Sequence, residues 1–165
     1  MEESTLSIII SVIALLISLF VLFGSKEKST TNTEADFSSK PLKLQAFERL
    51  VILCERISLP NIISRTAQPG MTARDMQIML VENIKQEFEY NASQQIYVSQ
   101  TAWEAVRNLR DQSLLIINSI AKTLPADAKA NDLNKGLLET IMNQENAALH
   151  TLTLTTLNEE AKKVM

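Results

Sequence analysis

The sequence predicts an all-α protein, with a single N-terminal transmembrane helix followed by a small bundle of about five helices. The first observation is an apolar segment at residues 6–23, which holds 18 residues without a charge, Pro or Gly. The second is that apolar residues recur at three- and four-residue steps through most of residues 42–165. This spacing places them on one face of each helix, so one hydrophobic core is expected.

Residues 6–23 are long enough to cross a membrane once. At 1.5 Å per residue, a helix of this length spans about 27 Å, close to the thickness of the hydrocarbon core of a bilayer. A cleaved signal peptide would begin with basic residues and end at small ones, whereas Glu2 and Glu3 precede this segment and Leu22 and Phe23 end it. A retained anchor is therefore favoured over a signal peptide, and also over a buried core helix.

The flanking charges predict the orientation of this helix. The N-terminal tail, residues 1–5, has no basic residue, whereas Lys26 and Lys28 follow the apolar segment and Lys40 lies further on. Because cytoplasmic flanks carry the excess of Lys and Arg, the N-terminus is expected outside and the C-terminal domain in the cytoplasm. The expected location is the inner (cytoplasmic) membrane, with the lipid bilayer as a partner.

Residues 24–41 predict a flexible linker, because they are rich in Ser, Thr, Lys and Glu and show no apolar period. The helical soluble domain is expected to cover residues 42–165. Its first helix is predicted at residues 42–58. The apolar stripe of this helix consists of Phe47, Leu50, Val51, Cys54 and Ile57.

Cys54 is the single cysteine, and no basic cluster surrounds it in the sequence. It is predicted to be a buried core residue rather than a reactive thiol. A short helical turn at residues 59–63 and a Pro-Gly turn at residues 66–70 then lead to the next helix.

Thr72, with Asp75 three residues later, has the spacing of a capping box and predicts a helix that runs to about Tyr90. At this spacing its methionines are more typical of a core than of an adaptable binding groove. The stripe consists of Met76, Met79, Leu80, Ile84 and Phe88.

Residues 93–99 are β-like but too short and isolated to build a sheet. They are predicted to form an extended connector whose apolar residues 96–98 enter the core. The next helix is expected to open near Ser99 or Thr101, with Glu104 completing a capping pattern in the second case. Its stripe consists of Trp103, Val106, Leu109, Ser113, Ile116, Ile117, Ile120, Ala121 and Leu124.

Two more helices are predicted at residues 132–143 and 147–165. The stripe of the first consists of Leu133, Leu137, Leu138, Ile141 and Met142. The stripe of the second consists of Leu149, Leu152, Leu157, Ala161 and Val164.

No residue pattern indicates catalysis, a cofactor or a metal. His150 is the only histidine and has no carboxylate three or four residues away, so Zn, Fe and Cu sites built from His and Cys are not expected. The three glycines lie far apart, which excludes a P-loop and a dinucleotide fingerprint.

Nucleic acid is not an expected partner. Lys and Arg total 16 against 19 Asp and Glu, so no strongly basic surface is available. Residues 60–84 superficially resemble a helix-turn-helix, but the second helix is acidic and would be repelled by phosphates. Its acidic residues could instead supply carboxylates to a divalent ion, although a solvated face interleaved with Arg74 and Lys85 is favoured. They are Asp75, Glu82, Glu87 and Glu89.

Polar and aromatic residues at helix starts and connectors are the first candidates for binding a protein partner, because Tyr and Trp are common interface anchors. They are Tyr90, Gln94, Gln95, Tyr97 and Trp103. For Trp103 a place in the core is favoured over a place in an interface.

Four segments carry a resemblance to a known family: QAFERLVILCERISLPNIISR at residues 45–65, GMTARDMQ at 70–77, IKQEFEYNASQQIYVSQTAWEAVRNLRDQ at 84–112 and the closing LNEEAKKVM. The chain resembles a bacterial family of unknown function with one N-terminal transmembrane helix and a helical cytoplasmic domain. The resemblance implies this architecture and no particular activity.

Two classes of function follow. The favoured one is a non-catalytic, membrane-anchored interaction or scaffold protein, which presents its helical domain at the cytoplasmic face to an unknown protein partner or to further copies of itself. The alternative is an enzyme or regulatory subunit of a membrane complex, with an unrecognised carboxylate site around residues 82–90.

Overall fold

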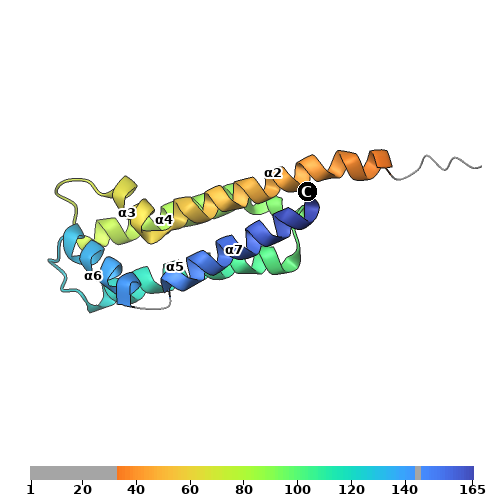
Figure 1. The fold of residues 1–165 in the computed structure, drawn as a ribbon. Coiled ribbons are helices and arrows are strands. Elements are labelled where there is room, and N and C mark those ends of the chain that lie inside the picture. Colours follow the sequence, from red (N-terminus) through yellow and green to blue (C-terminus); the bar gives the residue numbers. More distant parts are fainter. Residues whose placement is uncertain (1–32, 144–145) are drawn as a thin grey trace, which may run out of the picture. The chain divides into compact units, whose positions relative to one another are not determined.

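The computed structural model describes residues 33–143 and 146–165, and this part of the chain is all-α (Figure 1). The predicted fold class is thereby confirmed for the described residues. In chain order the elements are α2 (Thr33–Ile57), α3 (Leu59–Thr66), α4 (Ala73–Asn91), the 3-10 helix η1 (Ala92–Ile96), α5 (Gln100–Thr123), α6 (Ala130–Asn143) and α7 (Asn146–Val164).

The predicted transmembrane segment, residues 6–23, lies outside the described residues, as does the predicted N-terminal tail. Within residues 33–143 and 146–165, no helix is both long enough and apolar enough to cross a bilayer.

Helix α2 begins at Thr33, within the segment where a linker was predicted, and continues through Pro41 to Ile57. Apolar periodicity reveals only helices that bury a face, and residues 33–40 carry no such stripe. Pro41 resembled a helix start because proline is favoured in the first turn and lacks the N–H that an interior turn uses. The compact helical unit runs from Ser39 to Met165.

In this unit α4 and α5 are the central helices. Helix α4 contacts α3, α5 and α6, and α5 also contacts α6 and α7. Figure 1 shows α2 running alongside α4, and α7 alongside α5. The predicted stripes meet between these helices, and each large apolar side chain that is buried there contributes roughly 1.5–3 kcal/mol. The largest fully buried side chains are Leu50, Leu53, Ile57, Ile62, Met76, Leu80, Ile84, Val106, Ile117, Leu133, Leu137 and Leu157.

Three residues that were predicted to lie in the core are exposed instead. Leu138 is 37% exposed and Met142 85% exposed on α6, and Leu152 is 62% exposed on α7. On α7 the buried position beside Leu152 belongs to Thr153, whose hydroxyl donates to the carbonyl of Leu149 at 2.9 Å. A threonine that bonds to its own helix can occupy a core position, which hydropathy alone does not indicate.

The starts of α4 and α5 follow the sequence closely. The Thr72 hydroxyl accepts from the Asp75 amide at 3.1 Å, and the Asp75 carboxylate accepts from the Thr72 amide at 3.2 Å, so the predicted capping box is present. Helix α5 is capped by Ser99, whose hydroxyl accepts from the Ala102 amide at 3.0 Å. Glu104 takes no part in this cap and accepts from the Gln100 amide group at 2.8 Å.

A short backbone contact that was not predicted joins the starts of α4 and α6. Thr72 and Lys129 form an isolated antiparallel β-bridge. The amide of Ala73 donates to Ala128 O at 2.9 Å, and the amide of Ala130 donates to Met71 O at 3.1 Å. This bridge fixes the two helix starts at one end of the unit.

Candidate functional site: the corner between α4 and α5

The five predicted partner-binding residues fall within or beside one corner of the helical unit. Helix α4 ends at Asn91, the chain turns through η1, and α5 begins at Gln100. The amide of Tyr97 donates to Gln94 O at 3.0 Å and closes η1. The side-chain amide of Asn91 donates to Glu87 O at 2.8 Å and supports the last turn of α4. The corner is therefore held by its own hydrogen bonds.

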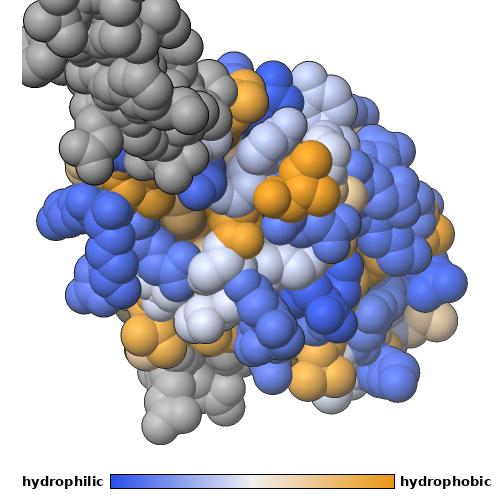
Figure 2. All heavy atoms as spheres, turned by 90° about the vertical axis from the view of Figure 1, so that its right-hand side faces the viewer, coloured by the Kyte–Doolittle hydropathy of each residue, from blue (hydrophilic) through white to orange (hydrophobic). Residues whose placement is uncertain are grey.

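Among the exposed residues of the corner, three have large aromatic or apolar side chains. Tyr90 is 74% exposed, Ile96 72% and Tyr97 36%, and Gln95 is also exposed. We refer to these four residues as the corner patch. Figure 2 views the end of the unit that carries η1, where apolar side chains lie in separate patches between hydrophilic ones.

The prediction that the connector places residues 96–98 in the core was wrong for Ile96 and for Tyr97, which are both exposed. Residues 92–96 form a 3-10 helix where an extended connector was predicted, and the side chains of this helix are spread around its axis. Gln94 is the buried residue of η1 and Val98 is half-buried, so Ile96 and its neighbour Gln95 are left to face the solvent. Ile96 is thus a surface residue that the sequence analysis missed, and no periodic signal marks it.

Two of the five predicted residues have structural roles. Gln94 is buried, and Trp103 is half-buried against the core. The rings of Trp103 and Phe88 lie 5.1 Å apart, and the Arg110 guanidinium lies 4.0 Å from the centre of the Phe88 ring. Trp103 therefore joins α5 to α4 beneath the corner, in line with the expectation that favoured the core for this residue.

A groove of about 520 Å³ lies beside the corner patch. Ile96 and Tyr97 form one side, and Phe47 of α2 contributes apolar surface. The charged residues of the lining have both signs and are Lys43, Glu160 and Lys163. The groove therefore joins the corner to α2 and to the end of α7. An apolar hollow with aromatic and charged residues around it is suited to receiving side chains of another protein.

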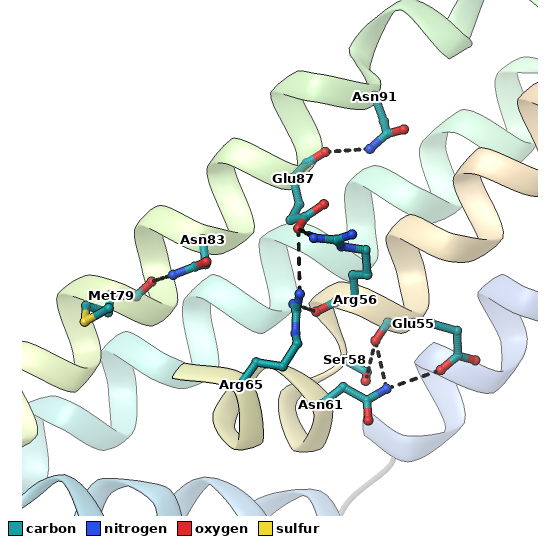
Figure 3. A network of polar contacts seen from close by, with 9 residues as sticks. All are labelled: Glu55, Arg56, Ser58, Asn61, Arg65, Met79, Asn83, Glu87 and Asn91. Atoms are coloured by element: carbon teal, nitrogen blue, oxygen red, sulfur yellow. Dashed lines mark hydrogen bonds and ion pairs between the residues drawn. The ribbon is translucent and has the colours of Figure 1, made fainter. Parts of the chain in front are cut away.

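Glu87, which the predicted carboxylate site would have used, is engaged in a structural network (Figure 3). Its carboxylate accepts from Arg56 Nε at 2.7 Å and lies 3.8 Å from Arg65 Nη1. Arg65 also donates to the carbonyl of Arg56 at 2.6 Å. The network joins α2, α3 and α4. The positive charges paired with Glu87 are those of Arg56 and Arg65.

Two further kinds of reactive site to consider among the described residues are a metal cluster and an activated thiol. Within residues 33–143 and 146–165, no group of three or more His, Cys, Asp or Glu side chains is placed to hold a metal ion. Cys54 is buried as predicted, and burial raises the pKa of its thiol from 9.0 to about 12. A thiol with this pKa is protonated at physiological pH and is a poor nucleophile.

The comparison with known families agrees with one part of the resemblance noted in the sequence, namely a family of unknown function. Residues 3–164 match a family that is described as a family of unknown function (DUF7935). No curated protein and no solved structure matches the chain. The match extends over nearly the whole length of the chain, and the protein therefore belongs to this family of unknown function.

Proposed function

We propose that this chain is a non-catalytic, membrane-anchored interaction protein, which presents its helical domain at the cytoplasmic face of a bacterial inner membrane and binds a partner protein through the corner patch. The observation that carries the binding part of this proposal is the exposure of Tyr90, Ile96 and Tyr97 at one corner of the helical unit. Large side chains exposed together in this way are typical of interaction sites.

The membrane part of the proposal rests on the sequence. Residues 6–23 have the length and the composition of a single transmembrane helix. Lys26, Lys28 and Lys40 all follow this segment and favour a cytoplasmic position for residues 39–165. The chain between the apolar segment and α2 covers residues 24–32, which at about 3.3–3.6 Å per residue reaches no further than roughly 30 Å. The proposed anchor would keep the helical unit close to the bilayer.

The contacts within the unit support an interaction role over a catalytic one. Glu87 serves as the acceptor for two arginines, and the Cys54 thiol is buried and protonated. The corner patch is different, because two of its exposed residues are tyrosines. Tyrosine gives a large contact area at a low entropy cost and adds a hydroxyl for hydrogen bonding, so a protein surface is the partner that it fits best.

The experiment that tests this proposal compares two double variants of the tagged full-length chain. Tyr90→Ser with Tyr97→Ser alters the corner patch. Leu115→Ser with Leu152→Ser is the matched control, because these leucines are also large and exposed but lie several helical turns away on α5 and α7. Each chain is purified from its native membranes in mild detergent, and the mass and the composition of the complex are measured.

We expect a second protein at a fixed stoichiometry with the wild-type chain and with the control variant. With the corner variant its recovery should fall by tenfold or more, because loss of an aromatic anchor typically costs about 2 kcal/mol or more. Purification of the chain alone, as a monomer or as a homo-oligomer, would contradict the proposal. Equal recovery with both variants would show that the partner binds at a different surface.

A further inference from the structure

A second concave site lies at a distance from the corner, between α3, α5, α6 and α7. It has a volume of about 300 Å³, the lower end of the range found for small-molecule pockets. Its walls are largely apolar and include Leu59 of α3, Leu109 and Ile116 of α5, and Leu149 of α7. The α5 residues of this pocket lie more than two helical turns beyond the start of that helix, so the pocket and the corner patch are separate surfaces.

Two polar residues of the pocket wall, Asn61 and His150, lie on either side of one carboxylate. Asn61 Nδ2 donates to the Glu55 carbonyl at 2.9 Å and lies 3.5 Å from Glu55 Oε2. His150 Nε2 lies 3.8 Å from Glu55 Oε1. Figure 3 shows Glu55 and Asn61 extending toward each other from α2 and α3. Glu55 does not itself line the pocket, but its carboxylate lies next to two residues that do, and in this sense it is at the rim.

The Nε2 atom of His150 is buried, yet it has no hydrogen-bond partner within the described part of the chain. Buried polar atoms are nearly always paired in folded proteins, so an unpaired one at a pocket wall points to a ligand group that the site can accept. Thus both the shape of the pocket and the chemistry of this atom indicate a ligand.

The charge of the residues at the rim determines whether the ligand group should be positive or negative. Arg56 and Arg65, which lie on either side of residues 58–61 of the pocket wall in the sequence, are both held by Glu87. The ion pair of Glu55 is with His150, and it carries a full charge on both sides only when the imidazole is protonated. Half of the Glu55 side chain is exposed, so its negative charge is accessible at the mouth of the pocket.

We propose that this pocket binds a small primary amine whose body is apolar or aromatic. The body fills the space between α3, α5, α6 and α7. The ammonium group carries three N–H donors, so it can donate to the Glu55 carboxylate and to a neutral His150 nitrogen at the same time. A carboxylate on the same body would be repelled by Glu55, and a hydroxyl would gain no ion pair. The inference does not depend on the corner patch.

The test uses three probes that share a phenyl ring and a short alkyl spacer: phenethylamine, phenethyl alcohol and phenylpropionate. The full-length chain is placed in lipid nanodiscs, and its isoleucine methyl groups are labelled with carbon-13. Ile116 and Ile141 line the pocket and report binding there. Ile78 is an exposed residue of α4 outside the pocket and serves as the internal control for probe that enters the lipid.

We expect saturable shifts of Ile116 and Ile141, with no matching shift of Ile78. The amine should bind more tightly than the alcohol by about threefold to fivefold, as expected for an ion pair that is partly exposed to water, and the carboxylate should bind most weakly. Absence of pocket shifts with all three probes would overturn the proposal. Binding of the carboxylate as tightly as the amine would do the same.

Two variants separate the charge from the cavity. Glu55→Gln should abolish the preference for the amine and leave the alcohol unchanged, whereas Glu48→Gln, an exposed glutamate on the same helix, should change neither. Ser113→Leu places a larger side chain in the pocket and should remove the shifts with every probe. An equal effect of Glu48→Gln and Glu55→Gln, or full binding by a folded Ser113→Leu variant, would overturn the assignment.

Discussion

Glu87 shows how a single side chain links three helices of this protein. Its carboxylate belongs to α4 and is bound by Arg56 of α2 and Arg65 of α3, and its side chain is only 16% exposed. A partly buried carboxylate with two guanidinium partners is more strongly held than a surface ion pair, because less water competes for it. The residue therefore belongs to the scaffold that positions α3 against α4.

Replacement of Glu87 by Gln should destabilise the protein by about 1–2 kcal/mol, because two charged partners lose their acceptor. The matched control is Glu82→Gln on the same helix. Glu82 pairs with Lys85 at 3.6 Å, and both side chains are more than half exposed. Its loss should cost less than about 0.5 kcal/mol. Urea unfolding of the full-length chain in detergent gives both values, and equal losses would contradict this role of Glu87.

Because the Cys54 thiol is buried, the free energy of unfolding is expected to decrease at alkaline pH. Burial raises the thiol pKa to about 12 in the folded protein, from the value of 9.0 that an unperturbed cysteine has in an unfolded chain. Above pH 9 the unfolded chain releases a proton that the folded chain retains, so ionisation favours unfolding. This contribution is fully present below pH 9 and is lost as the pH rises to about 12, at a rate on the order of 1 kcal/mol per pH unit.

The difference between the wild-type chain and Cys54→Ala isolates this contribution, because the other groups titrate alike in both. The stability advantage of the wild-type chain should shrink between pH 9 and about 12 in chemical unfolding experiments. A constant difference over this range would show that the thiol is not protected by burial.

At the scale of elements, the sequence predicts a helix best where that helix buries a face or carries a cap. The stripes from Phe47 to Ile57 and from Met76 to Phe88 were correct because apolar residues are repeated at helical spacing. Three features could not be predicted in this way: the early start of α2 at Thr33, the burial of the Thr153 side chain, and the bridge between Thr72 and Lys129. Each depends on tertiary contacts or on a helix without a buried face.

Among single polar residues at the helix ends, we expect Thr72 of the capping box to make the largest contribution to stability. Thr72→Ala removes the hydroxyl that accepts from Asp75 N and donates to Asp75 Oδ2 at 2.6 Å. The expected loss is about 1–2 kcal/mol in thermal or chemical unfolding. The hydroxyl of Thr72 also lowers the pKa of Asp75, so this cap is strongest above the usual titration range of a carboxyl and weakens as the pH falls.

Thr123→Ala is a suitable control for this cap. The Thr123 hydroxyl is also exposed and donates to Ile120 O, but it lies at the last residue of α5 and caps no helix start. It should change stability by less than about 0.5 kcal/mol. A Thr72→Ala variant that is as stable as Thr123→Ala would contradict the contribution of the box.

At the scale of the whole molecule, the two candidate surfaces differ in how far the sequence could predict them. The corner patch lies within residues 90–97, so its aromatic and polar residues are close together in the sequence and were found there, apart from Ile96. The pocket is assembled from α3, α5, α6 and α7, and its residues are separated by long stretches of chain. Only the packing of the helices brings these residues together, so no local sequence pattern predicts the pocket.

The proposed architecture combines these surfaces with a membrane anchor at residues 6–23. An anchored domain needs only moderate affinity for a partner in the same membrane, because the anchor raises the effective concentration. The nearly balanced charge of the chain, 16 basic against 19 acidic residues, also favours specific contacts over general electrostatic attraction to phosphates. A scaffold at the membrane surface accounts for these features together.

The proposed topology places residues 39–165 in the cytoplasm behind a single membrane anchor. The most direct measurement is labelling of a Gln95→Cys variant with a membrane-impermeant maleimide, because Gln95 is exposed and the native Cys54 is buried and unreactive. We predict labelling only after the membrane is permeabilised, and labelling of Ser4→Cys in intact cells. Labelling of Gln95→Cys in intact cells, or its recovery in the soluble fraction, would contradict the proposed topology.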